Sequence, residues 1–447
     1  MGLAALLLTP YWLIQGIRHG KYLSNLKERL GLSFPALEKL PSARTGAIWL
    51  HAVSVGEVLA GVTLAKRLKE EFKESLLVVS TTTITGQALA RERMPFADAV
   101  IYFPLDWAFC ARRATAAVQP AIVVVVETEI WPNFLREASR RNVPVVFVSG
   151  RISDRSFARS QSWLSVAGFY LRPFLKDALG RAAGFWMQSE KDAERVKALG
   201  ASPEKVRIAG NLKYDLELPK STPLAEWLEA ELARNGRRPL IVAGSVVATE
   251  EPLALIAFGV AQGEYRKALL VLAPRKPERF DAAAAFITES QRTYVRRSSL
   301  SVPSPSGQMT GGNETQIADD VTVLLLDSIG ELASLYRLAD GVFVGGSLVE
   351  SGGHNILEPA AFGKVAVFGE SMENFAEIAE RFVAAGAALQ VGSPEDAGVS
   401  WIELVRDPER NGRMGEAARR LVDESRGATD RAMEAIRTYI AKEQRAK

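Results

Sequence analysis

The run Ile122-Val123-Val124-Val125-Val126 decides the fold class of this chain. An uninterrupted series of β-branched residues predicts a strand covered on both faces, as the central strands of a parallel sheet are. Similar short apolar runs recur along the sequence, and stretches of helical length such as 57–72 separate them. This alternation predicts an α/β protein whose parallel sheets are wrapped by helices.

The apolar runs fall into two series. We expect strands at 47–51, 76–80, 99–103, 122–126, 145–149, 184–188 and 206–208, and then at 240–243, 269–272, 322–326, 342–344, 365–368 and 388–391. The periodicity lapses at 216–223, a polar stretch with two prolines, which is typical of a domain boundary. We therefore predict two Rossmann-like, doubly wound domains over 23–218 and 222–447. Residues 298–320, rich in Ser, Pro, Gly and Asn, are predicted to form a mobile surface loop.

The first 22 residues predict a short membrane anchor. Residues 1–17 are apolar and aromatic near their end, and basic residues follow from Arg18 onward, as is usual for a segment whose flank stays on the cytoplasmic side. As a helix, 1–17 would run only about 25 Å, and Pro10 and Gln15 interrupt it. A shallow interfacial anchor and a full span therefore both stay open, and a secretory signal is the less favoured alternative.

The composition excludes several classes of protein. The 447 residues carry 55 basic and 52 acidic side chains, so no overall field favours nucleic acid as a partner. Cys110 is the single cysteine, which excludes a disulfide framework and a cysteine-rich zinc site and fits a reducing compartment. With three histidines and no ligand spacing, the sequence predicts neither a metal nor a cofactor.

The segment 51–57 is the first candidate site, because ligands of parallel sheets lie at the carboxyl ends of strands. A strand runs into a turn with Ser54 and Gly56, and a helix begins near Glu57. A carboxylate at this point can accept a proton from an attacking hydroxyl, the task of a general base. The alternative is that Glu57 only complements the positive end of its helix. His51 is assigned a structural role.

The segment 127–133 is the second candidate. Glu127 and Glu129, with a Trp between strand and helix, could bind polyhydroxyl groups. A capping arrangement around a core Trp explains the same residues, and both interpretations stay open.

The third candidate, 345–359, is glycine-rich and follows a strand. Backbone N–H groups of Gly345, Gly346 and Ser347 could cradle a nucleotide phosphate, and Glu358 could bind ribose hydroxyls. Tight packing is the alternative explanation of the glycines. Lys213 and Arg275, at other strand ends, could neutralise a phosphate.

Together these motifs resemble the 3-deoxy-D-manno-octulosonic acid (Kdo) transferase family of lipid A biosynthesis. The resemblance is carried by the segments 51–57, 127–133, 210–215, 244–251, 274–280, 327–336, 345–361 and 374–378. Two local departures are Lys276, where many members carry His, and the segment 150–153.

The resemblance implies an inverting glycosyltransferase of the GT-B fold, whose two domains face an interdomain cleft. CMP-Kdo would be the donor, the lipid A precursor lipid IVA the acceptor, and the cytoplasmic face of the cell inner membrane the location. The residues that it implies are Glu57 as general base, Ser54, Gly56, Glu127 and Glu129 on the acceptor side, and Lys213, Ser245, Arg275, Gly345, Gly346, Ser347, Asn355, Glu358 and Asn374 at the donor site.

Three alternatives to this function stay open at the level of sequence. One is a nucleotide-sugar epimerase, which needs neither lipid nor anchor; another is a different membrane-associated GT-B glycosyltransferase; the third is a non-catalytic scaffold. The sequence leaves undetermined the number of Kdo residues transferred, the acylation preference and the oligomeric state.

Overall fold

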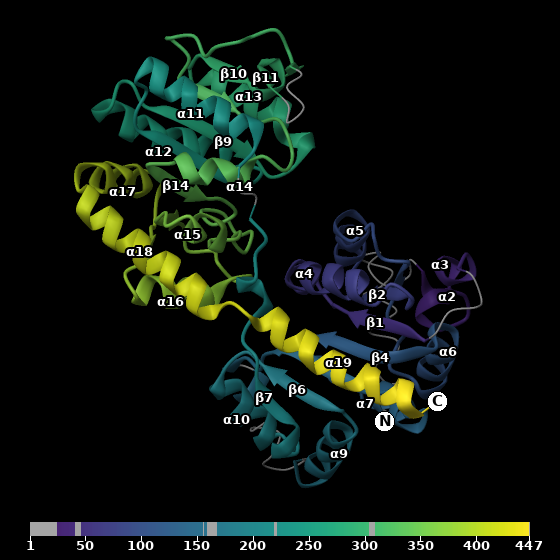
Figure 1. The fold of residues 1–447 in the computed structure, drawn as a ribbon. Helices are drawn as coiled ribbons and strands as arrows, with labels where there is room; N and C mark the ends of the chain where they lie inside the picture. Colours follow the sequence, from purple (N-terminus) through teal and green to yellow (C-terminus); the bar gives the residue numbers. More distant parts are fainter. Residues whose placement is uncertain are drawn as a thin grey trace. The chain divides into compact units, whose positions relative to one another are not determined.

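The computed structural model describes residues 25–40, 46–154, 156–158, 168–218, 221–303 and 309–446. They form two compact units: unit 1 contains the described residues up to Asp215 and from Ser425 onward, and unit 2 contains Leu216–Glu424. Figure 1 shows both units as helices around parallel sheets. The predicted anchor at 1–22 lies outside the described residues. Within the described ranges, no helix is long and apolar enough to cross a membrane.

Unit 1 is built on a parallel sheet of seven strands in the order β3-β2-β1-β4-β5-β6-β7. The strands are β1 (Ala47–His51), β2 (Leu77–Thr81), β3 (Ala99–Tyr102), β4 (Pro120–Val126), β5 (Val145–Gly150), β6 (Gly184–Met187) and β7 (Val206–Ile208). The chain order reverses between the neighbours β1 and β4. Such a switch point is where doubly wound sheets bind their ligands.

Helices cover both faces of this sheet, as the valine run requires. Val123 and Val125 pack into one core with α6 (Ala108–Val118), α7 (Pro132–Arg140), α9 (Gly168–Gly180) and α10 (Glu190–Ala198). Val124 and Val126 pack into the other with α4 (Val55–Glu71), α5 (Ile84–Arg93) and α19 (Ala428–Ala446). Successive strand residues point to opposite faces, so β4 is apolar throughout because both faces are buried. The short helices α2 (Leu26–Arg29) and α3 (Pro35–Glu38) precede β1.

Unit 2 repeats the plan with a second parallel seven-stranded sheet, in the order β10-β13-β9-β8-β14-β15-β16. Its strands are β8 (Leu240–Val246), β9 (Leu269–Pro274), β10 (Tyr294–Arg296), β13 (Val323–Leu325), β14 (Gly341–Val344), β15 (Ala366–Phe368) and β16 (Ala388–Gln390). Its helices are α11 (Pro223–Asn235), α12 (Glu251–Glu264), α13 (Phe280–Glu289), α14 (Leu332–Leu335), α15 (Leu357–Ala361), α16 (Ala376–Ala384), α17 (Pro394–Arg406) and α18 (Pro408–Ser425). The switch point of this sheet lies between β8 and β14.

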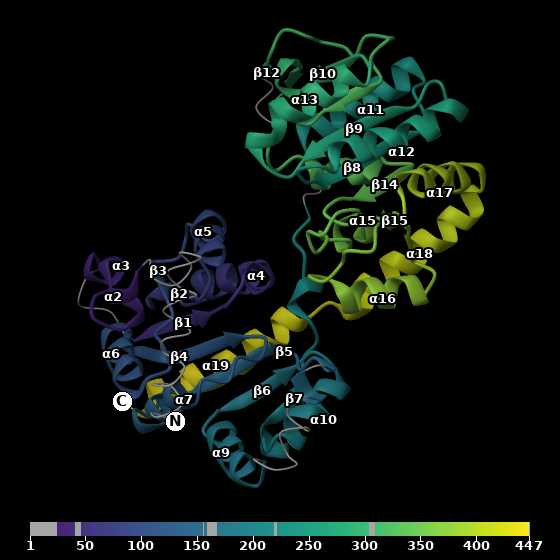
Figure 2. The same ribbon diagram turned by 180° about the vertical axis from the view of Figure 1, so that it is seen from behind.

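The last helix corrects the predicted extent of the C-terminal domain. Residues 222–447 were expected to form one domain, but α19 packs on the sheet of unit 1, where it lies along β4 (Figures 1 and 2). Its buried face includes Ala432, Met433 and Ile436. A helix with an apolar stripe must bury it, and the stripe alone does not say against which sheet.

The expected mobile loop at 298–320 is structured over much of its length, so that prediction is wrong in part. The described part holds the antiparallel pair β11 (Ser301–Pro303) and β12 (Met309–Gly311). Leu300, Val302 and Ile317 from this segment are buried. Three separated apolar residues are enough to anchor a segment whose composition otherwise resembles a loop.

Candidate functional site

Glu57 lies at the third position of α4, directly after β1, and is only 8% exposed. The backbone N–H of Val53 donates to its Oε2 at 2.7 Å, and the Ser54 hydroxyl donates to its Oε1 at 2.9 Å. The carboxylate thus closes the turn into the helix, much as the acid of a capping box does. These contacts hold it in one orientation, so the two interpretations of Glu57 are compatible.

The pKa of Glu57 is shifted from the usual range of a carboxyl group toward neutral pH. Burial, followed by the negative charge of Glu127, raises the pKa of Glu57 to about 8. Burial and Glu127 also raise the pKa of Glu129, to about 7. A base is most effective when its pKa lies near the working pH, so both carboxyl groups are in the useful range.

The negative charge of Glu127 contributes to the raised pKa of both Glu57 and Glu129. The backbone of Glu127 is also unusual. This residue follows β4 with a φ of 61°, in the left-handed region that few non-glycine residues adopt. Lys213 Nζ lies 3.6 Å from its Oε1. The structure therefore places Lys213 in unit 1 beside Glu127, whereas the other predicted donor-binding residues lie in unit 2. The left-handed turn directs the chain from β4 into the 127–131 loop.

Asp106, which the sequence analysis missed, holds the far end of that loop. Its carboxylate accepts the backbone N–H groups of Asn133 (3.1 Å) and Phe134 (2.8 Å) and so caps the start of α7. At the near end, Thr128 Oγ1 accepts the N–H of Arg151 at 2.9 Å. Both ends of the acidic loop are thereby fixed. Asp106 follows β3, so attention to every strand end would have found it.

His51 has the structural role expected of it. It is fully buried, its Nδ1 lies 2.9 Å from Ser80 Oγ, and its ring stacks on Phe103 at 3.9 Å. Burial lowers the pKa of His51 to about 3, so the ring stays neutral. It supports the end of β1, from which Ser54 and Glu57 follow.

In unit 2, the structure corrects the predicted phosphate cradle. The backbone N–H groups of Gly346, Ser347 and Leu348 donate to the carboxylate of Glu250, at 2.6, 3.0 and 3.0 Å. The N–H of Gly345 donates to Gly244 O. A phosphate therefore cannot use these amides in this structure, because an internal carboxylate already does.

Tight packing, the alternative explanation given above, accounts for the glycines of this loop. A Cβ at position 345 would lie 2.6 Å from Ser245 O and 2.8 Å from Glu250 Oε2. Gly346 has a φ of 71°, which favours glycine. The glycines thus allow the loop to close over Glu250.

Most of the other predicted donor-binding residues do gather at the carboxyl edge of this sheet. Ser245, with a φ of 57°, is the second-last residue of β8, and the N–H of Arg275 donates to Val246 O at 2.7 Å. Asn355 Oδ1 accepts the N–H of Leu357 at the start of α15. Glu358 follows in that helix, and the N–H of Asn374 donates to Gly352 O at 2.9 Å. Ser245, Arg275 and the 352–358 segment thus belong to neighbouring strand ends.

His354 is a further residue of this edge that the sequence analysis did not assign. Burial, followed by the charge of Arg275, lowers the pKa of His354 to about 4. Its buried Nε2 has no hydrogen-bond partner among the described residues. A neutral imidazole therefore lies near the guanidinium of Arg275.

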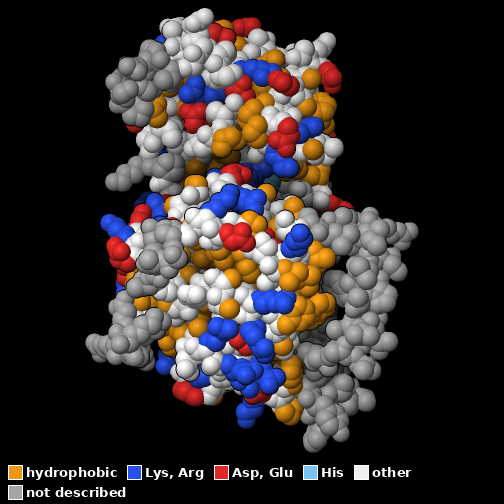
Figure 3. All heavy atoms as spheres, turned by 90° about the vertical axis from the view of Figure 1, so that its right-hand side faces the viewer, with side chains coloured by type: hydrophobic (Ala, Val, Ile, Leu, Met, Phe, Trp, Pro, Cys, Tyr) orange, Lys and Arg blue, Asp and Glu red, His pale blue; other side chains and the backbone are white. Residues whose placement is uncertain are grey.

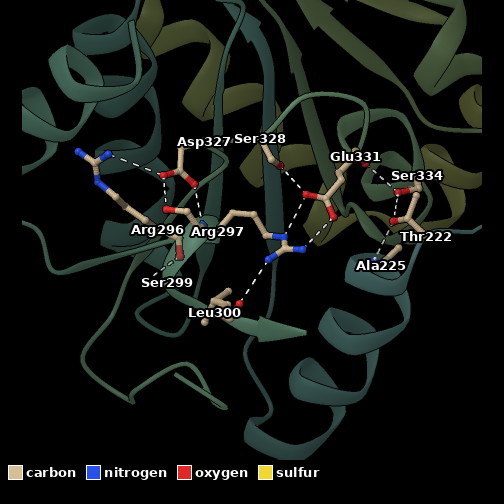
Figure 4. A network of polar contacts seen from close by, with 11 residues as sticks. Thr222, Ala225, Arg296, Arg297, Ser299, Leu300, Asp327, Ser328, Glu331 and Ser334 are labelled. Carbon is tan, nitrogen blue, oxygen red and sulfur yellow. Dashed lines mark hydrogen bonds and ion pairs between the residues drawn. The ribbon is translucent and has the colours of Figure 1, made fainter. Parts of the chain in front are cut away.

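The segment after β13 is held by a polar network (Figure 4). Arg297 Nε lies 3.0 Å from Glu331 Oε2, and the N–H and hydroxyl of Ser298 both donate to Asp327. The hydroxyl of Ser334 is hydrogen-bonded to the hydroxyl of Thr222, and Thr222 caps the start of α11. The network explains the polar character of 327–334 as structural support. Among the described residues, no group of three or more acidic, His or Cys side chains could hold a metal ion.

Comparison with known proteins adds a sequence relationship to this geometry. A family model described as 3-deoxy-D-manno-octulosonic-acid transferase matches residues 24–216, and one described as glycosyl transferases group 1 matches 313–421. The 3-deoxy-D-manno-octulosonic acid transferase of Haemophilus influenzae is 32% identical over 427 residues, which cover 95% of this chain and 93% of that protein. The protein of that name from Bordetella pertussis is also 32% identical, over 90% of this chain and 89% of its own length.

A solved structure supports the architecture. The crystal structure of a Listeria monocytogenes protein assigned as a UDP-N-acetylglucosamine 2-epimerase matches with a TM-score of 0.53. It covers 89% of this chain and 98% of its own, at 14% identity. At that identity the likeness shows the fold alone, the GT-B arrangement of two Rossmann-like domains.

Proposed function

The chain belongs to the 3-deoxy-D-manno-octulosonic acid transferase family of glycosyltransferases, and from this premise we propose that it transfers Kdo from CMP-Kdo to lipid IVA with inversion. The observation that carries the proposal is Glu57. It is a buried carboxyl group with a pKa of about 8, held at the switch point of the unit that the family model matches.

In the proposed reaction, Glu57 takes the proton from a sugar hydroxyl of the acceptor as that oxygen attacks the anomeric carbon of Kdo. Attack from the face opposite CMP inverts the configuration. Burial and the charge of Glu127 keep the pKa of Glu57 high enough for this proton transfer, and Glu129 borders the acceptor hydroxyls. Ser54 and the turn at Gly56 keep the base oriented.

The proposal assigns donor binding to unit 2, with the phosphate at Arg275. A guanidinium can pair with a phosphate through two parallel N–H bonds and stabilises the charge on the leaving CMP. Glu358 and Asn355 are assigned to the nucleoside, and Ser245 and Asn374 border the sugar. Gly345, Gly346 and Ser347 contribute through the loop that they shape, because their amides are bonded within the protein.

The acceptor is a membrane lipid, and one face of unit 1 suits contact with the cytoplasmic face of the inner membrane. Exposed apolar side chains lie on and beside α2 and α6, among them Leu26, Leu32, Trp107 and Phe109. Exposed Lys27, Arg112 and Arg113 accompany them. Figure 3 shows the molecule from this side, and hydrophobic (orange) and basic (blue) patches lie next to one another on the surface of unit 1. Membranes that contain anionic lipid bind surfaces of this kind, because apolar side chains insert at the interface and basic side chains are attracted to the negative charge. α2 is the first described helix of the chain, and the predicted anchor at 1–22 precedes it in the sequence.

The epimerase alternative is favoured only by similarity of fold. The epimerase structure is 14% identical, whereas the transferase relatives are 32% identical over most of both chains. An epimerase would convert a nucleotide sugar in the absence of lipid. Analysis of the products formed from nucleotide sugar alone would reveal that activity.

The test of the proposal is an assay of detergent-solubilised protein with lipid IVA and CMP-Kdo generated in place, followed by mass spectrometry of the lipid. We expect the lipid to gain Kdo, and Glu57→Ala to lower the rate by about 100-fold or more. Glu70→Ala, an exposed acid on the same helix, is the matched control and should retain activity. Unmodified lipid with folded, CMP-binding wild-type protein would overturn the acceptor, and an active Glu57→Ala would overturn the base.

A further inference from the structure

Glu250 is a charged side chain at the donor edge for which the proposed reaction has no use. It is fully buried at the start of α12. Besides the N–H groups of Gly346, Ser347 and Leu348, its carboxylate accepts the N–H of Val247 at 3.3 Å. Converging backbone N–H groups of this kind form the concave sites in which proteins hold anions. In this protein the anion is part of the chain.

The carboxylate joins two loops that are far apart in sequence. Val247 follows β8, and Gly346 follows β14, its neighbour at the switch point of the sheet. Glu250 Oε2 accepts an N–H group from each of these loops, and Oε1 accepts two more from the second loop. The position of 346–348 relative to the end of β8 therefore depends on this carboxylate.

The effect continues to the residues assigned to the donor. The N–H of Gly353 donates to Gly346 O at 2.7 Å, and the His354 ring lies 2.9 Å from where a Cβ at 346 would be. Asn355 and Glu358 follow directly. Holding Gly346 in place thus holds the backbone from which His354 and Asn355 project.

We propose that Glu250 is a positioning residue that sets the affinity for the nucleotide sugar by keeping the 346–355 loop in its ligand-binding shape. This inference rests on the proposed function, in which this edge of unit 2 binds CMP-Kdo. Its carboxylate serves as a built-in anion that the loop closes around, and the donor phosphate binds beside the loop at Arg275.

Loss of Glu250 would leave several unsatisfied N–H groups, and the loop would sample other shapes. Apparent affinity falls in proportion to the fraction of molecules that are competent to bind. A loop in the right shape about one tenth of the time would weaken nucleotide binding about tenfold. We expect KM for the donor to rise and kcat at saturating donor to change much less, because Glu57 in unit 1 is untouched.

The experiment compares CMP binding by calorimetry in the full-length wild type, Glu250→Gln, Glu250→Ala and the control Glu251→Gln. Glu251 is the neighbouring, equally buried acid, and it pairs with Arg279 at 2.8 Å instead of the loop. We expect at least about tenfold weaker CMP binding in both Glu250 variants and wild-type affinity in the control. Glu250→Gln keeps the side-chain volume, and so provides the test if Glu250→Ala does not fold.

Chemical rescue separates this role from general stability. Formate fits the space that Glu250→Ala vacates and presents the carboxylate that the amides bind, so it should restore CMP affinity to that variant alone. Wild-type affinity in Glu250→Gln would overturn the inference while the donor assignment stands. Equal losses in Glu250→Gln and Glu251→Gln would do the same. A wild type that binds no CMP would overturn the donor assignment of the proposed function itself.

Discussion

Individual residues show how burial and hydrogen bonding give similar side chains different tasks. Glu57 and Glu250 are both buried glutamates close to the end of a strand. Glu57 accepts one backbone N–H and one hydroxyl, and burial together with the neighbouring carboxylates raises its pKa. Glu250 accepts backbone N–H groups from two loops and holds them together. One glutamate is suited to exchange a proton, and the other to fix a backbone.

The raised pKa of Glu57 predicts a cost in stability. The folded-state pKa of about 8 exceeds the usual value of 4.5, so its contribution to stability is full below pH 4.5 and is lost as the pH rises through 8. We expect Glu57→Gln to be more stable than the wild type at about pH 9, by on the order of 5 kcal/mol, and the difference to vanish near pH 4.5. Urea unfolding of unit 1 at both pH values measures this. Equal stability at high pH would contradict the burial of an ionised Glu57.

The coupling between Glu57 and Glu127 predicts the pH dependence of transfer. The acid side of the kcat/KM profile should report the deprotonation of the coupled carboxyl group. Glu127→Gln removes the neighbouring charge that raises the pKa of Glu57, so this limb should move to lower pH. Glu71→Gln, which alters a distant ion pair with Arg437, should leave the limb in place. An unmoved limb in Glu127→Gln would show that another group titrates.

At the scale of elements, the ends of strands and helices position the site. The loop from Glu127 to Asn133 connects β4 to α7, and Thr128 and Asp106 fix its two ends. In unit 2 the loops after β8 and β14 close over Glu250. Both sites are therefore made of loops that take their shape from the strands behind them.

The cap on α7 predicts one effect on stability and one on activity. Asp106→Ala removes the acceptor of two backbone N–H groups, which should cost about 1–2 kcal/mol of the free energy of unfolding. Because the acidic loop ends at this cap, kcat/KM should fall as well. Chemical unfolding and the lipid assay measure the two effects. Asp177→Ala, which breaks only an exposed ion pair with Arg181, should change neither by much.

The docking of α19 predicts where its mutations act. Ile436 is fully buried in the core that α19 shares with α4 and β4, so Ile436→Ala should destabilise unit 1 by about 2–4 kcal/mol. Hydrogen exchange should speed up in β1 and β4 and stay unchanged in β8 and β14. Arg437→Ala, which loses an exposed ion pair with Glu71, should cost less than about 1 kcal/mol. Faster exchange in unit 2 would contradict the assignment of α19 to unit 1.

At the scale of the whole molecule, one fold is used twice with different chemistry. Each unit has a parallel seven-stranded sheet with a switch point, between β1 and β4 in one and between β8 and β14 in the other. Unit 1 places carboxyl groups there, whereas unit 2 places a cation, a neutral imidazole and a closed glycine loop. The proposed division of labour, acceptor activation in unit 1 and donor binding in unit 2, follows from this difference.

The proposed membrane face predicts a difference between the two units in lipid binding. Phe109→Glu adds a charge to the apolar surface beside α2 and should weaken binding to vesicles that contain anionic lipid. Ile256→Glu on unit 2 is the matched control, because Ile256 and Phe109 are both 45% exposed. Co-sedimentation with vesicles measures both variants. Equal binding by Phe109→Glu and the wild type would place the lipid contact elsewhere.

The sequence alone determined those structural features that depend on residues close together along the chain. The strand Val206–Ile208 was predicted to the residue, and the valine run of β4 was recognised as doubly covered, because burial on two faces leaves a local apolar signature. The position of Glu57 at the start of a helix was likewise readable, since helix starts have local signals.

Only the tertiary structure decided which of these features meet. Glu250 and Gly346 are 96 positions apart, so no local pattern shows that the glycines enclose a carboxylate instead of a phosphate. The order of strands brings Glu127 to Glu57, and α19 returns to the first sheet for the same kind of reason. An apolar stripe or a row of N–H groups specifies that it needs a partner, and long-range packing selects which partner it finds.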